Sequence, residues 1–179
     1  MLRFLNVSNW NTSKWKVTNL YGTWYNCIKL RRITFENWNT SNWAVTTMYQ
    51  CWSSCSSLEE LDLSNWDTSN WKVETLLQMV YTCHSLKSMK GTINASMVTS
   101  TSNTFGGCPS LTEVPVLNGL NISVSLAGTI LSRDQATNFL EGLAEVEVAR
   151  TVTFSAATSK SLSADDKAVA TSKGWTVAG

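Results

Sequence analysis

The stretch NWDTSNWKVETL, residues 65–76, decides the fold because it is the third copy of one motif. The earlier copies are NWNTSKWKVTNL at residues 9–20 and NWNTSNWAVTTM at residues 37–48, so each copy begins 28 residues after the one before it. A fixed period of about 20 to 50 residues is the signature of small structural units stacked on one another. The sequence therefore predicts a solenoid in which each unit buries its apolar side against its neighbours.

Each unit combines a short strand pattern, a polar turn and a longer apolar stretch. The units begin at Leu5, Ile33 and Leu61, and a fourth unit, three residues shorter, begins at Met89. In the strand slots, apolar residues flank one polar residue, which is the pattern of a strand with one buried face. In the longer stretch of the second unit the apolar residues are Val45, Met48, Trp52, Cys55 and Leu58. Steps of three and four positions predict helical turns on the outer side of a parallel sheet.

Composition limits the classes of function. The chain has 179 residues, a formal net charge of +1 and 43% hydrophobic residues, as expected for one ordinary soluble domain. Its 14 basic and 13 acidic residues form no basic stripe, so we expect no nucleic-acid partner. No apolar run approaches the roughly 20 residues that cross a bilayer, so we expect no membrane insertion. Because Leu5 already lies inside a unit, we expect a C-terminal fragment whose targeting sequence, if any, lies upstream.

Cysteine and asparagine recur at the repeat period and are expected to form structural ladders. These residues are Asn9, Asn37 and Asn65 in the turns, with Cys27, Cys55, Cys83 and, in the shorter unit, Cys108 in the apolar stretches. Free cysteine behaves as a small buried hydrophobe, so we interpret the cysteines as packing residues. No second cysteine pair or histidine cluster accompanies them, and we expect neither a metal nor a cofactor.

No set of residues predicts an enzyme. The only histidine, His84, occupies a slot that holds Ile28 and Ser56 in other units, whereas a catalytic base needs a particular partner and place. There is no glycine-rich phosphate loop and no zinc-protease motif. The sequence therefore predicts no catalytic residue.

Aromatic residues supply the candidate binding surfaces. Trp10, Trp38 and Trp66 are expected to be buried in the turns. Three further tryptophans have polar neighbours and lie 28 residues apart, namely Trp15, Trp43 and Trp71. They could pack on each other over an enlarged loop, or form an aromatic platform for a glycan or protein ligand along one rim. A second candidate surface is the outer face, with Tyr21, Tyr25, Tyr49 and Tyr81. A third is the strand surface, with Asn6, Thr34, Asp62 and Lys90.

The period fades after Leu111, and a different organisation follows. Ser132 with Gln135 predicts a capped helix over residues 132–146, and Ser163 predicts a second helix that ends near residues 173–174. Alternating residues predict strands at 151–155 and 175–177. We therefore divide the chain into repeats at residues 1–113 and a capping segment at residues 114–179, which shields the last apolar edge.

The repeat resembles the leucine-rich repeats of the BspA-like family of bacterial surface proteins. The resemblance rests on LDLSNWDTSN at residues 61–70, the apolar stretch, and CHSL at residues 83–86 before the next strand. It implies an α/β solenoid with a curved parallel sheet, located outside the cell or at its surface. It also implies a non-catalytic adhesion module that binds a protein or glycan receptor. Two alternatives stay open, the receptor-binding tip of a phage tail fibre, on the virion, and a structural spacer without a ligand. The sequence indicates no oligomeric state.

Overall fold

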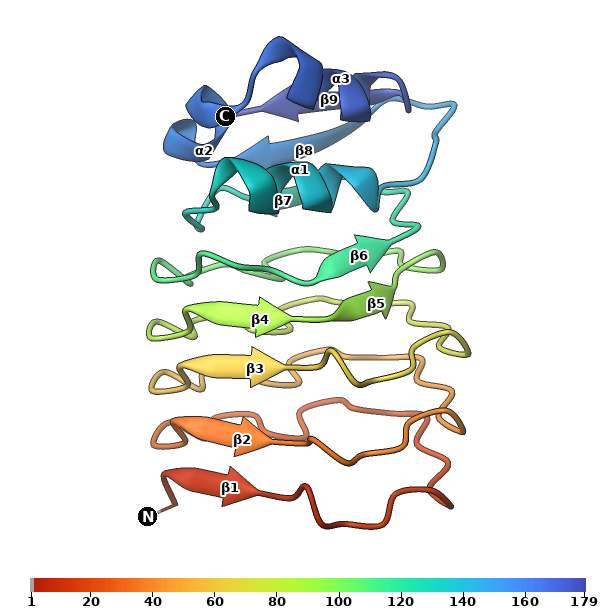
Figure 1. Ribbon diagram of the computed structural model, residues 1–179, viewed down its shortest axis with the longest axis vertical. Helices are drawn as coiled ribbons and strands as arrows, with labels where there is room; N and C mark the ends of the chain where they lie inside the picture. The colour runs from red at the N-terminus through yellow and green to blue at the C-terminus, as the bar shows by residue number, and fades with distance from the viewer. Residues whose placement is uncertain (1) are drawn as a thin grey trace.

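The first four strands lie side by side and run in the same direction (Figure 1). The computed structural model describes residues 2–179. The strands of this parallel sheet, in order, are β1 (Phe4–Asn6), β2 (Arg32–Thr34), β3 (Glu60–Asp62) and β4 (Ser88–Lys90). Leu5 pairs with Ile33 and Leu61 pairs with Met89, so neighbouring strands are one repeat period apart. The predicted strand in each unit and its parallel pairing with the next strand are confirmed. We call residues 2–30, 31–58, 59–86 and 87–111 coils 1 to 4.

Coil 4 takes a shorter path than the others. Only Gly91 separates β4 from β5 (Thr92–Asn94), which pairs in parallel with β6 (Val116–Asn118). Figure 1 shows β5 and β6 displaced along the coils from the column that β1 to β4 form. The missing residues of the fourth unit therefore belong to the segment that carries the Asn-Trp turn in coils 1 to 3.

The outer side of the stack consists of separate turns. In coil 2, Gln50 and Ser54 have φ values of 53° and 63°, and equivalent residues of coil 3 share this conformation. Left-handed residues interrupt a right-handed helix, so the chain closes single turns, such as the one in which Cys51 N–H donates to Met48 O at 3.1 Å. The predicted helical turns are thus isolated turns, and residues 2–132 contain no helix.

One hydrophobic core runs along the stack between the sheet and the outer turns. Leu61 from β3 is 1% exposed, and Met48 and Trp52 from the turns of coil 2 are fully buried. Their equivalents in coil 3 are also buried, so each coil contributes a layer to a continuous interior. Because a single coil is too small to enclose these side chains, stacking supplies most of the burial.

Among residues 2–179, helices occur only in the C-terminal part. It contains β7 (Val124–Leu126), α1 (Arg133–Glu141), β8 (Arg150–Phe154), α2 (Ala156–Ser161), α3 (Ala164–Thr171) and β9 (Trp175–Ala178). β7, β8 and β9 form a parallel three-stranded sheet. The two predicted strands are confirmed as β8 and β9, and the two predicted helices as α1 and α3. The sequence analysis missed α2.

The first helix is shorter than predicted. Ser132 caps α1 by accepting a hydrogen bond from Gln135 N–H, as predicted, but the helix stops at Glu141 instead of residue 146. Leu143 then forms a parallel bridge with Leu120, which draws the chain into an extended path. The Lys173 ammonium donates to Glu141 O at 2.7 Å and to Leu143 O at 3.0 Å. It thereby satisfies carbonyl groups that would otherwise continue the helix.

Candidate functional site

The tryptophans predicted for an aromatic rim are mostly inside the protein. Trp43 and Trp71 are each 1% exposed, and only Trp15 in coil 1 has substantial exposure, at 37%. Their rings stack, with centroids 6.4 Å apart for Trp15 and Trp43 and 6.3 Å for Trp43 and Trp71. The tryptophans of the Asn-Trp turns cover these rings, since the ring centroids of Trp38 and Trp43 lie 5.5 Å apart. Of the two alternatives, packing of the rings on each other is confirmed, and the platform is wrong for Trp43 and Trp71 because neither can present its ring to a ligand.

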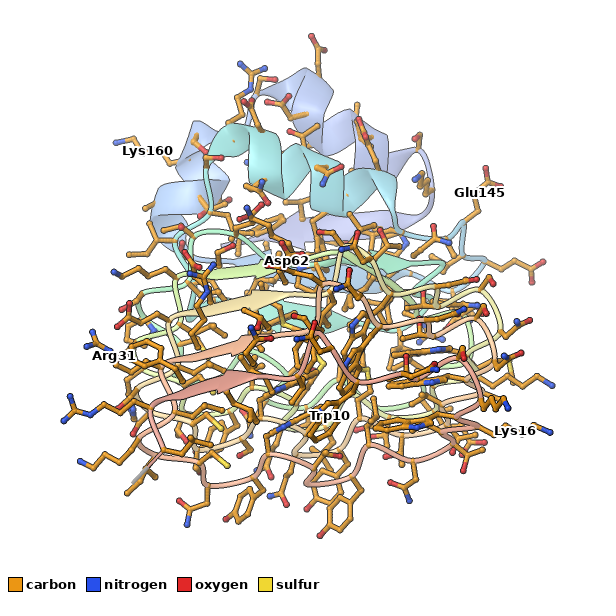
Figure 2. The ribbon with its side chains drawn as sticks, turned by 60° about the horizontal axis from the view of Figure 1, so that its bottom comes forward. Trp10, Lys16, Arg31, Asp62, Glu145 and Lys160 are labelled. Atoms are coloured by element: carbon orange, nitrogen blue, oxygen red, sulfur yellow. The ribbon has the colours of Figure 1, made fainter. Side chains whose placement is uncertain are left out.

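The tryptophans of the Asn-Trp turns form a second stack beside the first. Trp38 and Trp66 are buried as predicted, at 6% and 5% exposure. Trp10 is 51% exposed, so the prediction of burial is wrong for coil 1. The stack supplies the reason, because no coil among residues 2–179 packs on the outer side of Trp10. Figure 2 brings this open end of the stack forward, with Trp10 labelled there.

The polar ladder of the turns uses other residues than those predicted. Asn9, Asn37 and Asn65 are exposed, and within residues 2–179 only Asn65 bonds through its side chain, to Glu36 O at 3.3 Å. The ladder instead uses buried threonines, in which Thr12 Oγ1 donates to Asn39 O and Thr40 Oγ1 donates to Asp67 O. The signal was present in the sequence, since threonine recurs in this slot at every repeat.

The cysteine ladder is confirmed as a packing feature. Cys55, Cys83 and Cys108 are fully buried, and Cys27 is partly buried. Each of the three buried thiols donates to a backbone carbonyl of the preceding coil at 3.0 Å. Burial raises the pKa of Cys55 to about 12 and that of Cys108 to about 11. All five cysteines are free, and residues 2–179 contain no group of three or more potential metal ligands of the His, Cys, Asp or Glu type.

The outward side of β2 to β4 bears a shallow depression of about 170 Å³. Its polar lining consists of Arg32, Thr34, Glu36, Glu60, Asp62, Asn65, Ser88 and Lys90. Of these, only Thr34, Asp62 and Lys90 belong to the strand surface that the sequence analysis singled out. Arg32 and Glu60 were missed because the sequence analysis considered only the residue after the central apolar residue of each strand, and these two lie before it. Glu36 was missed because it lies beyond the end of β2. Figure 2 shows Asp62 beside these strands.

Two details of this depression bear on ligand binding. The Thr34 hydroxyl is buried and has no hydrogen-bond partner within residues 2–179. Partial burial acts to raise the pKa of Asp62, but hydrogen bonds from Ser64 and the charge of Lys90 outweigh it and lower that pKa. Asp62 is thus a carboxylate at neutral pH, and Arg32 lies 3.6 Å from Glu60 across the same surface. The depression presents both signs of charge around an unsatisfied hydroxyl.

Comparison with known families adds one finding. The family model described as "Mycoplasma protein of unknown function, DUF285" matches residues 2–116. The chain belongs to the DUF285 family. No curated protein and no solved structure matches it. The DUF285 match covers the four coils and ends at the first residue of β6, before the helices of the C-terminal part begin.

The predicted tyrosines lie on the outer turns of this DUF285 chain but do not form one surface. Tyr21 and Tyr25 are 55% and 50% exposed, and Tyr49 and Tyr81 are half-buried. The rings of Tyr21 and Tyr49 stack with centroids 5.0 Å apart. Exposure is greatest in coil 1, where no other coil of residues 2–179 lies on the outer side of these side chains, so it reflects position in the stack more than a shaped site.

The remaining candidates carry little chemistry. His84 is exposed, and its carbonyl accepts a hydrogen bond from the Ser110 hydroxyl at 2.8 Å.

No helix formed by residues 2–179 is both long and apolar enough to cross a membrane. Among the surfaces considered from the sequence, the depression over β2 to β4 combines the most varied polar groups with a defined hollow.

Proposed function

We propose that this protein is a non-catalytic recognition module of a bacterial surface protein, and that it binds a protein or glycan receptor through the strand surface of its coils. In this proposal coils 1 to 4 are a leucine-rich-repeat solenoid of the BspA-like kind, and residues 114–179 are its capping segment. The DUF285 match supports the bacterial setting. The strand surface supports the recognition role.

The strand surface separates constant from variable positions. The central residue of each strand faces the core and is always apolar, as Leu5, Ile33, Leu61 and Met89 are. The residue after it faces outward and changes from Asn6 to Thr34, Asp62 and Lys90. A stack of this kind holds its shape through the inner positions, so the outer ones are free to vary with a ligand.

The observation that carries the proposal is the depression over β2 to β4, which gathers side chains of both charges around one hollow. A hydrogen bond between a ligand and one of these exposed charged groups would contribute about 1.5–3 kcal/mol. Arg32, Asp62 and Lys90 surround the hollow and would orient a polar ligand by charge.

Binding of the whole 179-residue chain to animal cells, and to arrays of glycans and extracellular proteins, tests the proposal. We expect Asp62→Ala to weaken binding by about tenfold, the effect of losing a charged hydrogen bond. Glu74→Ala is the matched control, because Glu74 is an exposed carboxylate on the outer side and does not line the depression. We expect it to bind like the parent chain.

The outcomes separate recognition from a spacer role. Equal binding by Asp62→Ala and the parent would rule out the strand surface as the binding site. A parent chain that binds none of the cells or arrayed molecules would favour a structural spacer. Circular dichroism of each variant checks that the fold is intact.

A further inference from the structure

A notch interrupts the strand side of the molecule where coil 4 lacks an Asn-Trp turn. Thr40 Oγ1 donates to Asp67 O at 3.2 Å, and one coil further on Thr68 Oγ1 donates to Thr92 O at 3.1 Å. Thr92 therefore takes the structural place of Asp67. Coil 3 has residues 63–66 between its strand and this point, but coil 4 has only Gly91. The space that a fourth turn would fill is left open.

Gly91 makes this short path possible. Its φ is +109°, and a Cβ atom there would lie 2.8 Å from both the carbonyl carbon and the carbonyl oxygen of Leu63. Only glycine avoids both the strained backbone and the clash. The chain is thus held tightly against the end of β3, and the notch is a fixed part of the fold.

The notch has a volume of about 640 Å³, within the range of about 300–1,000 Å³ typical of small-molecule sites. Coil 3 forms one wall through Ser64, Trp66 and Asp67. Asn118 of β6 and Asn138 of α1 form the opposite side. Because Asn138 lies in α1, the helix borders one end of the notch, and Figure 1 shows α1 next to β6. Residues from the coils and from the C-terminal part thus meet at one hollow.

The lining of the notch is polar and nearly uncharged. Asp67 is its only charged residue. Its Oδ1 accepts hydrogen bonds from the hydroxyl and the N–H of Ser69, at 2.6 and 3.0 Å, and these bonds lower the pKa of Asp67. The side chains of Asn118 and Asn138 are exposed and make no hydrogen bond within residues 2–179, so their amides are free to donate and accept.

This set of groups suits a sugar better than an anion or a peptide. Neighbouring sugar hydroxyls both donate and accept, which matches a carboxylate flanked by free amides and the Ser64 hydroxyl. Val116, with the 5% of Trp66 that is exposed, adds a small apolar contact for the C–H groups of a sugar ring. No lysine or arginine lines the notch, so a phosphate, sulfate or carboxylate group would find no counter-charge and would be repelled by Asp67.

We propose that the notch binds a neutral saccharide unit of a glycan. This inference deepens the proposed recognition function and rests on it, but it concerns a different part of the strand side from the Asp62 depression. The ligand is an uncharged oligosaccharide whose hydroxyls bond Asp67, Asn118 and Asn138.

The test uses the whole chain on an array of neutral and anionic glycans, followed by calorimetric titration with the best neutral oligosaccharide. Asp67→Asn removes the charge but keeps the turn, because Asn39 in coil 2 makes the same bonds to Ser41. We expect about tenfold weaker binding. Asn138→Trp fills the notch from an exposed helix position, and we expect it to abolish binding. Ala168→Trp on α3, also exposed and not part of the notch, is the size-matched control and retains binding.

Each result decides for or against the notch. Loss of binding in Asn138→Trp with retention in Ala168→Trp supports it. Binding that survives Asn138→Trp but is lost in Asp62→Ala overturns the notch and leaves the recognition function in place. A chain that binds only anionic glycans, only proteins or no arrayed molecule also overturns the notch, and the last of these contradicts the recognition function as well.

Discussion

Trp38 and Trp66 lie with their ring centroids 5.9 Å apart and their planes 9° from parallel, so the indoles of neighbouring Asn-Trp turns stack on one another. The same relation holds between Trp10 and Trp38 at 6.2 Å. Position in the stack therefore sets the burial of a residue that is identical in every copy. The same substitution, tryptophan to alanine, at two of these positions tests this relation.

Trp66→Ala should destabilise the protein far more than Trp10→Ala. Removing a buried tryptophan costs about 3–5 kcal/mol, because the surrounding groups cannot fill the cavity. Trp10 keeps half of its surface in water, so its removal should cost only about 1–2 kcal/mol. Urea unfolding, followed by circular dichroism, measures the loss of stability in both variants. Equal losses for the two variants would show that the stack does not control their burial.

Gly91→Ala should cost about 1–3 kcal/mol, because it forces a side chain into a left-handed conformation against the Leu63 carbonyl. Gly128→Ala is the control, since a Cβ atom there would lie 3.7 Å from its nearest neighbour, an ordinary contact. We expect the free energy of unfolding of Gly128→Ala to stay within about 0.5 kcal/mol of that of the parent. Chemical denaturation of both variants provides the measurement, and a harmless Gly91→Ala would contradict the tight path of coil 4.

The buried thiols should make the protein lose stability in alkali. A thiol whose pKa is raised in the folded state stays protonated there, while the unfolded chain ionises near pH 8.5. The contribution of the buried thiols to the free energy of unfolding is complete below that pH. It falls as the pH rises toward about 11 and 12, the folded-state pKa values of Cys108 and Cys55. Cys55→Ala should lose less stability than the parent between pH 8 and pH 10. Melting temperatures across this range test it, and parallel curves would argue against thiol burial as the cause.

In the C-terminal part, Arg133 should contribute to stability through Asp166. Arg133 Nε donates to Asp166 Oδ2 at 2.7 Å, and Asp166 also completes the capping box with Ser163 at the start of α3. Hydrogen bonds from Arg133 and then from Ser163 lower the pKa of Asp166. The contribution is therefore complete above the unfolded pKa, about 3.9, and is lost as pH falls below it.

Asp166→Asn should have a lower melting temperature than the parent at pH 7. On acidification from pH 5 to pH 2, its melting temperature should fall by less than that of the parent. Thermal melts at several pH values test this prediction. Asp165→Asn is the control, because Asp165 is a neighbouring carboxylate of the same helix and makes no salt bridge within residues 2–179. An equal response of the two variants would contradict a specific role for Asp166.

The repeat period was sufficient to predict the parallel strands and the cysteine ladder, because both depend on which residues recur. The separate outer turns could not be predicted in the same way. Their apolar spacing matches a helix, and the left-handed positions that break it hold Gln50 and Ser54 in coil 2. The same positions hold Gly22 and Asn26 in coil 1, a turn signal that the helical spacing concealed. Backbone conformation at these points follows from bonds to the next coil, such as Gln50 N–H to Leu77 O, which a single unit does not reveal.

The candidate sites were harder to predict than the fold. Polar neighbours such as Asn42 suggested exposure of Trp43, yet Asn42 faces outward and bonds Ser13 O while Trp43 points into the core. The notch arises from residues that coil 4 lacks, so no motif marks it. The sequence shows that the fourth unit is shorter, but the packing of Gly91 against Leu63 shows where the space opens.

Within residues 2–179 the two ends of the stack differ, and we expect this difference to give the unfolding of this 179-residue chain a direction. Helices close the C-terminal end, while coil 1 leaves one edge of β1 and the side chains of Leu2, Phe4 and Trp10 in contact with water. Contacts in a stack are local, so coil 1 can detach while later coils keep their own neighbours. We therefore expect the amide protons of coil 1 in this chain to exchange with solvent first, and the surfaces of coils 2 to 4 to persist after coil 1 has opened.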